Sequence, residues 1–210
     1  MEMTVNEVLD ILSFEYPNPK SELNYDDLFS LLIAVILSAQ ATDKSINKVT
    51  PNLFKVYPNL YSLAKADIKI VMETLNSISL YRNKSNFIIE TSKKIVNEFD
   101  GKIPQTREKL MSLPGVGRKT ANVVLAEGFG IPTIAVDTHI IRVAKRLKWA
   151  GENDSVLDVE KNLMNIIPKE RWIMVHHQLL LFGRYQSKAR DTRCIYEVLN
   201  SLKENRIKYE

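Results

Sequence analysis

Cysteine is nearly missing from this chain, because Cys194 is the only one among its 210 residues. A single thiol excludes an intrachain disulfide framework. The three histidines, His139, His176 and His177, have no nearby cysteines and no acidic pair at ligand spacing, which argues against a zinc site. We therefore expect no bound metal ion.

Long apolar runs are also missing. The longest, residues 28–37, is interrupted by Ser30 and is shorter than the roughly 20 residues that a membrane-spanning helix needs. The first residues, MEMTVNEVLDIL, contain acidic side chains and lack the basic start and apolar stretch of a signal or transit peptide. We expect a cytoplasmic protein without a membrane partner.

Neither sign of charge dominates, since 29 Lys and Arg residues against 25 Asp and Glu residues leave a net charge of +4. This small excess permits a polyanionic partner without establishing one. The length is sufficient for one domain or two small ones with a substantial core.

Strand patterns are scarce, and apolar residues recur at helical spacing through most of the chain. The stretch 27–39 is apolar on every side, which predicts a buried central helix. Phe87, Ile88 and Ile95 predict the apolar face of another helix, and Ser155 with Asp158 three residues later predicts a capped helix start.

The most informative stretch reads LPGVGRKTANVV. Gly115 and Gly117 can take a positive φ and allow another backbone to come close. The helix that follows begins with free N–H groups and a positive dipole end, which suit a phosphate. Arg118 and Lys119 add two cations there. The pattern is typical of a helix–hairpin–helix that holds a DNA backbone without reading its sequence.

A second capped helix is predicted shortly afterwards. Asp137 and Thr138 precede the apolar residues Ile140, Ile141 and Val143 at helical spacing. Position alone makes Asp137 a helix N-cap. A cap lies at a helix end, where its carboxylate can also face a cleft, so capping does not exclude a role in chemistry.

Three stretches resemble, in the same order, the endonuclease III family of DNA repair enzymes, which belongs to the helix–hairpin–helix superfamily. They are residues 31–43, LLIAVILSAQATD; residues 113–147, which include the hairpin; and residues 176–185, HHQLLLFGRY. The resemblance extends from about residue 19 to residue 185, which is nearly the whole chain.

The resemblance implies an all-α fold in which two helical domains flank a DNA-binding cleft. Residues 20–131 would form a central six-helix domain that carries the helix–hairpin–helix. Residues 1–19 and 132–210 would form the second domain.

The same resemblance implies a bifunctional DNA glycosylase and abasic-site lyase of base excision repair. Such an enzyme removes oxidised pyrimidines from duplex DNA. Its partner would be double-stranded DNA with damaged pyrimidines or abasic sites, and the chain would act as a monomer.

In LPGVGRKTA, the nucleophilic lysine of the family corresponds to Lys119. An unperturbed lysine has a pKa of about 10.4, so a nucleophilic role requires help toward the neutral amine. The helix start and the neighbouring Arg118 both disfavour the ammonium form, and burial would add to this. The resemblance implies that Lys119 attacks the sugar carbon C1′, expels the damaged base and forms a Schiff base that breaks the strand by β-elimination.

In IAVDTHI, the catalytic aspartate of the family corresponds to Asp137. Its implied task is to stabilise positive charge at the sugar carbon and to assist proton transfer. A carboxylate close to Lys119 would favour the ammonium form, so we expect Asp137 to lie nearer the sugar than the amine.

Two further residues correspond to side chains that enter the duplex. Gln40 would fill the gap left by the extruded nucleotide, and Leu80 would insert beside the opposite base. Without that role, Gln40 is a polar helix end and Leu80 an ordinary core residue. The remaining DNA contacts implied near the site are Gly115, Gly117, Arg118 and His139.

The C-terminal sequence departs from the family. Many members hold a [4Fe–4S] cluster with four cysteines after the GRY motif. Here Ser187 stands at the first ligand position, Cys194 matches the second, and Glu197 occupies the third. One thiolate cannot hold such a cluster, so we expect no cofactor.

A helix that packs on the domain is expected in place of the cluster. Asp191 or Thr192 would cap it. Its apolar face would consist of Cys194, Ile195, Val198, Leu199 and Leu202.

Lys188, Arg190 and Arg193 keep the preceding loop basic. The loop is expected to contact DNA phosphates, as the cluster loop does in relatives. The alternative is a solvated charged loop without a ligand.

Two other functions remain open from the sequence. A glycosylase of the adenine-mispair branch would lack a lysine at position 119, so Lys119 counts against it. A DNA-binding module that lost catalysis together with the cluster would have no need of both Lys119 and Asp137, although both can survive in an inactive protein.

Overall fold

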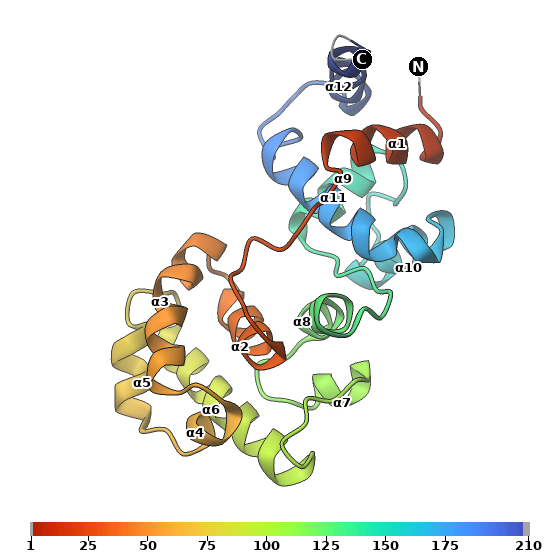
Figure 1. Ribbon diagram of the computed structural model, residues 1–210. Helices are drawn as coiled ribbons and strands as arrows, with labels where there is room; N and C mark the ends of the chain where they lie inside the picture. The colour runs from red at the N-terminus through yellow and green to blue at the C-terminus, as the bar shows by residue number, and fades with distance from the viewer. Residues whose placement is uncertain (1, 208–210) are drawn as a thin grey trace. The chain divides into compact units, whose positions relative to one another are not determined.

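The structure, a computed structural model, describes residues 2–207, and the side chains of residues 2–204 (Figure 1). This part of the chain contains twelve α-helices, one π-helical turn, one 3-10 turn and no strand. The all-α prediction is therefore confirmed. The chain divides into two compact units: Ser21–Ile131, and the residues up to Lys20 together with those from Pro132 onward.

The unit Ser21–Ile131 is built around one helix. Helix α2, Leu28–Ser38, is buried from Phe29 to Leu37, as its continuous apolar sequence predicts. The other elements of this unit are α3 (Asp43–Val56), α4 (Leu60–Ala64), α5 (Ile68–Leu75), α6 (Tyr81–Glu98), α7 (Arg107–Met111), α8 (Arg118–Val123) and the π-helical turn η1 (Val124–Gly128).

The serine that interrupts the apolar run fixes the start of α2. The backbone N–H of Ser30 donates to Asp27 Oδ1 at 2.7 Å, and the backbone N–H of Asp27 donates to Ser30 Oγ at 3.0 Å. This capping box satisfies N–H groups that would otherwise be buried without partners.

Helix α6 buries a more polar face than its apolar residues predict. Phe87, expected on that face, is 40% exposed, whereas Ile88 and Ile95 are fully buried. Lys84 and Thr91 are also buried on this helix. The buried positions 84, 88, 91 and 95 follow helical spacing, so hydrophobicity alone identifies only part of the face.

The second unit packs the N-terminal helix against helices from the end of the chain. Its elements are α1 (Val5–Glu15), α9 (Thr138–Arg146), α10 (Val156–Ile166), η2 (Lys169–Arg171), α11 (Trp172–Tyr185) and α12 (Ile195–Ile207). Their apolar faces form one core, and α1 contacts both α11 and α12 (Figure 1).

Polar contacts tie α1 into that core. Arg171 donates to the carbonyl oxygen of Leu9 at 3.1 Å and to Ser13 Oγ at 2.9 Å. Gln178, which is buried on α11, donates to the carbonyl oxygen of Tyr16 at 3.1 Å. The predicted capping box of Ser155 and Asp158 begins α10. Among the described residues, no helix combines the length and the apolar character that crossing a bilayer requires.

Candidate active site and DNA-contact residues

A tight turn joins α7 to α8. The backbone N–H of Val116 donates to the carbonyl oxygen of Leu113 at 3.1 Å, with Pro114 and Gly115 between them. Gly115 has φ +75°, which gives the turn the proline–glycine sequence and backbone of type II. A Cβ atom at Gly115 would lie 2.9 Å from Phe87 Cβ, so the turn needs glycine for its conformation and for space.

Helix α6 supports this turn from the side. Thr91 Oγ1 donates to the carbonyl oxygen of Pro114 at 2.7 Å, and Thr91 is fully buried. Lys94 Nζ donates to the carbonyl oxygen of Ser112 at 3.0 Å. Two carbonyl groups that no helix can satisfy are therefore held by α6.

Gly117, the second glycine of the hairpin, has an ordinary backbone conformation. Its φ is −88°, so it does not use the positive φ that its glycine would allow. It is the N-cap of α8 without a side-chain cap, and a Cβ atom there would meet nothing within 4 Å. The absence of a side chain leaves the backbone at the start of α8 open to an approaching group.

Lys119 is the second residue of α8 and is exposed to solvent. Burial therefore does not help to keep the Lys119 amine neutral in this structure. Its helix is fixed to α7 by Arg107 Nε, which donates at 2.8 Å to Oδ1 of the buried Asn122. The π-helical turn η1 follows directly, and such turns are frequent at functional sites.

Gln40 lies in an exposed turn after α2. The backbone N–H of Ala41 donates to the carbonyl oxygen of Ser38 at 3.0 Å, and Ala39 has φ −55° and ψ 120°. Gln40 follows with φ 53°, the left-handed position of a type II turn that favours glycine or asparagine. A glutamine held there indicates a constraint from its surroundings.

Leu80 has the same uncommon backbone conformation. It precedes α6 with φ 57° and ψ 26°, and its side chain is 53% exposed. This excludes the reading of Leu80 as an ordinary core residue. Ser79 Oγ donates to the carbonyl oxygen of Gln40 at 2.5 Å, so the two turns are bonded to each other.

Asp137 is the N-cap of α9, as its position predicts. Its Oδ1 atom accepts hydrogen bonds from the backbone N–H groups of His139 at 2.9 Å and Ile140 at 3.0 Å. The four residues before it, 133–136, are buried. Asp137 itself is half-buried, so the carboxylate is fixed in place and still reached by solvent.

His139 is oriented by Arg142. Arg142 Nη2 lies 3.2 Å from His139 Nδ1, and a guanidinium can only donate, so Nδ1 accepts. Burial lowers the pKa of Arg142, and the nearby Arg146 lowers it further, while the Asp137 carboxylate raises it. Arg142 therefore places a positive charge in the electrostatic environment of Asp137.

Arg142 and Arg146, four residues apart on α9, hold the loop that follows α11. Arg142 Nη2 donates to the carbonyl oxygens of Gly183 at 2.7 Å and Ser187 at 3.1 Å. Arg146 Nη1 donates to Ser187 Oγ at 2.8 Å, and Nη2 donates to the carbonyl oxygen of Asp191 at 2.5 Å. We call these contacts the arginine clamp.

The loop itself is only partly as predicted. Lys188 and Arg190 are exposed, in agreement with a basic surface. Arg193 instead forms an ion pair with Asp191, with Nη2 2.6 Å from Oδ2. The hydrogen bonds of Arg193 lower the pKa of Asp191 to about 2, so the pair is ionised throughout the neutral range.

Helix α12 buries Ile195, Val198 and Leu199, as predicted. The prediction for Cys194 is wrong, because its side chain is exposed and lies outside the packed face. The expected cap is not observed at Asp191 or Thr192. Instead the backbone N–H of Cys194 donates to the Glu197 carboxylate at 3.3 Å. The Glu197 side chain thus gives a hydrogen-bond partner to the backbone N–H of the residue just before α12, as the glutamate of a capping box does.

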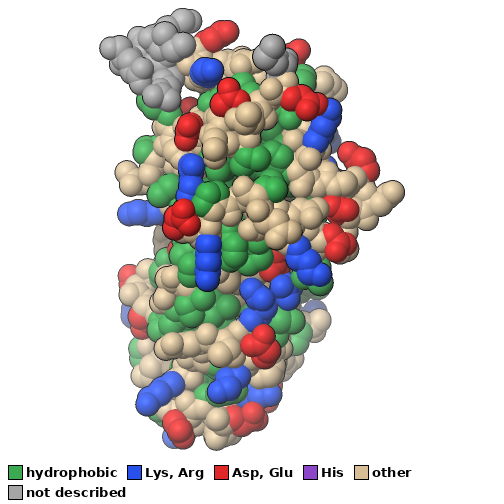
Figure 2. Space-filling model, turned by 90° about the vertical axis from the view of Figure 1, so that its right-hand side faces the viewer, with side chains coloured by type: hydrophobic (Ala, Val, Ile, Leu, Met, Phe, Trp, Pro, Cys, Tyr) green, Lys and Arg blue, Asp and Glu red, His purple; other side chains and the backbone are tan. Residues whose placement is uncertain are grey.

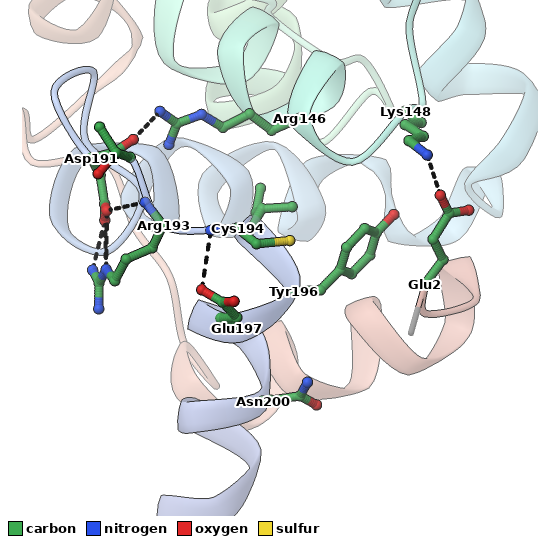
Figure 3. Close-up of a pocket in the computed structure, with 11 residues that line it drawn as sticks. Glu2, Arg146, Lys148, Asp191, Arg193, Cys194, Tyr196, Glu197 and Asn200 are labelled. Carbon is green, nitrogen blue, oxygen red and sulfur yellow. Dashed lines mark hydrogen bonds and ion pairs between the residues drawn. The ribbon is translucent and has the colours of Figure 1, made fainter.

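A cavity of about 800 Å³ opens beside this helix start (Figure 3). Figure 3 shows its walls tied by the Asp191–Arg193 and Glu2–Lys148 ion pairs and by the bond between Cys194 and Glu197. Neither Lys119 nor Asp137 lines it. The cavity is therefore separate from the residues proposed for chemistry.

The residues at the family's cluster positions do not fit an iron–sulfur cluster. Ser187 is fully buried and its Oγ accepts from Arg146, while Glu197 accepts from a backbone N–H. Nowhere among residues 2–207 do three or more His, Cys, Asp or Glu side chains form a group that could hold a metal ion.

Some residues that shape these sites escape sequence reasoning. Arg142 and Arg146 bond to carbonyl groups and a side chain 41 to 45 positions away, and Lys84 reaches the turn of Gln40 only through Ser79; no local pattern predicts these contacts. A weak signal is available for each: Lys84 falls on the helical spacing of the buried face of α6, and Arg142 and Arg146 are four residues apart beside buried Val143.

One face of the molecule carries Lys and Arg as well as Asp and Glu side chains, without either sign covering it (Figure 2).

The family description HhH-GPD superfamily base excision DNA repair protein matches residues 33–169. The chain is 46% identical over 186 residues to endonuclease III of Bacillus subtilis, covering 89% of this chain and 85% of the relative. It is 46% identical over 189 residues to endonuclease III of Escherichia coli K12, covering 90% and 89%.

Solved structures give the same relation. A trapped covalent intermediate of endonuclease III with DNA is similar with a TM-score of 0.87 and 46% identity, covering 90% of this chain and 89% of that one. A non-covalent endonuclease III–DNA complex is similar with a TM-score of 0.88 and 43% identity, covering 97% of each chain.

The same substitution at the two glycines of the hairpin should have a large effect at Gly115 and almost none at Gly117. Gly115→Ala should lower the free energy of unfolding by at least about 1–2 kcal/mol, because alanine is strained at positive φ and meets Phe87. Gly117→Ala should leave stability nearly unchanged, since its φ is ordinary and the space is open. Urea unfolding of both variants measures this, and equal losses would contradict the assignment of the turn.

Proposed function

We propose that Lys119 is the nucleophile of a DNA glycosylase and abasic-site lyase, because this chain belongs to the endonuclease III family of HhH-GPD superfamily base excision DNA repair proteins. The protein is a bifunctional enzyme that removes oxidised pyrimidines from DNA and cleaves the strand at the resulting site. The observation that supports Lys119 is its position in the first turn of α8, two residues after an open glycine N-cap.

The reaction needs one amine and one proton carrier. The neutral Lys119 Nζ forms a bond to C1′ while the glycosidic bond breaks, and the base leaves with that electron pair and takes up a proton. Nζ then gives up a proton, the C1′–O4′ bond of the sugar breaks, O4′ takes up a proton, and a protonated Schiff base forms between Nζ and C1′. Loss of a C2′ proton expels the 3′ phosphate by β-elimination, and water releases the enzyme.

Asp137 is proposed as the acidic partner in this reaction. Its carboxylate would stabilise the positive charge that develops at the sugar and would carry protons between steps. The support is that Oδ1 is fixed by two backbone N–H groups at the start of α9, so the carboxylate is held in one orientation.

The DNA would be held at several separate positions. Gly115, Gly117 and Arg118 would hold a phosphate at the hairpin, and His139 would make a contact beside Asp137. Gln40 and Leu80 would enter the duplex, which their exposed left-handed turns support. Lys188 and Arg190 would contact phosphates, while Arg193 contributes less because Asp191 already pairs with it.

The partner is proposed to be double-stranded DNA with damaged pyrimidines or abasic sites, bound by a monomer in the cytoplasm. No iron–sulfur cluster is proposed for this chain. The arginine clamp would hold the loop of residues 187–191 by hydrogen bonds instead.

Replacement of the nucleophile separates catalysis from binding. Lys119→Gln should give no covalent adduct when incubated with abasic duplex DNA and borohydride, whereas the unaltered protein should be trapped. Affinity for the duplex should stay within about tenfold, because at most one phosphate contact is lost. An adduct with Lys119→Gln would contradict the assignment. Failure of the unaltered protein to form any adduct, with binding retained, would favour a binding module.

Asp137→Asn separates capping from chemistry. Asparagine caps a helix about as well as aspartate, so the free energy of unfolding should change by less than about 0.5 kcal/mol. The rate of base release should fall on the order of 100-fold, because the charge and the proton carrier are lost. Single-turnover kinetics and urea unfolding measure the two effects. A stability loss that accounts for the lost activity would reduce Asp137 to a cap.

If the arginine clamp holds the loop of residues 187–191, the protein should contain no iron and the order of the loop should depend on Arg146. Elemental analysis should find no stoichiometric iron. Arg146→Lys keeps the charge but loses the two-pronged donor, so amide hydrogen exchange in residues 187–193 should accelerate and DNA affinity should fall. Lys161→Ala, at an exposed position of α10, is the control. Stoichiometric iron, or unchanged exchange in Arg146→Lys, would contradict the proposal.

A further inference from the structure

Lys84 occupies a position that is unusual for a lysine. It lies in the first turn of α6 and is 2% exposed. Lysine is almost never fully buried without a specific partner, because burial disfavours its charged form. Burial accordingly lowers the pKa of Lys84. Its side chain therefore needs an explanation that the proposed chemistry at Lys119 does not supply.

The partner of Lys84 is the serine between the two exposed turns. Lys84 Nζ lies 3.4 Å from Ser79 Oγ, and Ser79 Oγ lies 2.5 Å from the carbonyl oxygen of Gln40. A serine hydroxyl has one hydrogen, which is donated to the Gln40 carbonyl, so toward Lys84 it can only accept. The direction of the relay is thus defined: lysine donates to serine, and serine donates to the carbonyl.

Lys84 is also bonded to the second turn through its backbone. Its N–H donates to the carbonyl oxygen of Leu80 at 3.0 Å. This is the ordinary first hydrogen bond of α6, so Lys84 lies one helical turn after Leu80, while its side chain contacts Gln40 through Ser79. Gln40 and Leu80 are the two non-glycine residues with positive φ that the proposed function assigns to the duplex, at φ 53° and 57°.

We propose that Lys84 and Ser79 are positioning residues that hold Gln40 and Leu80 as one preformed pair for entry into the duplex. This inference rests on the proposed role of Gln40 and Leu80. Extrusion of a nucleotide has an unstacking cost, and a side chain that fills the gap is most effective when it is already in place. Left-handed turns with exposed side chains would otherwise relax, because nothing in their own sequence favours that backbone.

Ser79→Ala tests the relay at an exposed position, where the substitution creates no cavity in the core. It removes the hydrogen bond to Gln40 and leaves both side chains of the pair intact. Single-turnover base release from a duplex with thymine glycol paired to adenine should slow by roughly tenfold, as expected for loss of a hydrogen bond network. The same lesion opposite an abasic site should lose less than about twofold, because the lesion is already unpaired.

Two readouts distinguish positioning from a general structural effect. A 2-aminopurine beside the lesion should report less extrusion in Ser79→Ala at saturating protein. The melting temperature should fall only by about 2–6 °C relative to Ser77→Ala, an exposed serine of the same loop that serves as the control, because the buried Lys84 amine loses its serine partner while the protein stays folded at the assay temperature. Equal slowing on the paired and the unpaired lesion, or no slowing on either, would overturn the inference.

A double-mutant cycle tests whether Lys84 acts through Ser79. Lys84→Met keeps most of the buried stem and removes the amine, so it should slow release from the paired lesion to a similar extent. The double variant should be no slower than Ser79→Ala, since both changes break one relay. Multiplied effects would show that Lys84 acts independently and would overturn this part of the inference.

The outcomes also separate this inference from the proposed function. Ser79→Ala should still be trapped by borohydride on abasic DNA, because Lys119 is untouched. Loss of trapping in Lys119→Gln with normal extrusion in Ser79→Ala would overturn positioning alone. If Gln40→Ala and Leu80→Ala together left extrusion unchanged, the proposed role of the pair would be wrong, and the inference that rests on it as well.

Discussion

Carbonyl groups in exposed turns need hydrogen-bond partners, and in the unit Ser21–Ile131 helix α6 and the residues that precede it supply them. Thr91 and Lys94 donate to the hairpin turn between α7 and α8, and Ser79 donates to the turn after α2. Lys84 supports Ser79 from the buried side. The turns proposed to contact DNA are therefore fixed by one rigid element, which explains why this helix buries polar side chains that a purely apolar face would not contain.

Helix α9 combines two tasks in the other unit. Its N-terminal cap is Asp137, which is proposed to act in catalysis, and its last turns carry Arg142 and Arg146, which hold the loop after α11. Arg142 also orients His139 and adds positive charge near Asp137. A change in the clamped loop would therefore be felt at the start of α9, since the same guanidinium contacts both.

Local rules account for what the sequence predicted correctly. The buried helix α2, the type of backbone at Gly115 and the caps at Asp137 and Ser155 all depend on residues within four positions of one another. Such contacts follow from helical periodicity and turn chemistry, which are visible in a single sequence.

The sequence predicts less well where apolar spacing is not what fixes a residue. Phe87 is predicted on the buried face of α6, but it is 40% exposed, and the buried face contains the polar residues Lys84 and Thr91. Gly117 can take a positive φ, but its φ is −88°, in the extended region that any residue can adopt. Cys194 was expected in the apolar face of α12, but it precedes that helix and its backbone bonds to Glu197 instead. The relay from Lys84 to Gln40 joins residues that no pattern connects, because Ser79 and Gln40 are 39 positions apart.

The arginine clamp holds the loop after α11 by hydrogen bonds. A cluster held by thiolates joins its ligands through metal bonds, whereas the clamp joins α9 to backbone carbonyls by hydrogen bonds that exchange with water. Ser187 takes part through its hydroxyl, which a cysteine at the same position would replace with a poorer acceptor. At position 187 the chain therefore has no thiolate that could bind iron and has instead a hydroxyl that accepts a hydrogen bond from Arg146. Of the three positions compared with cluster ligands, Ser187 is the one that takes part in the clamp, so replacing it with cysteine would weaken the loop without creating a site for iron.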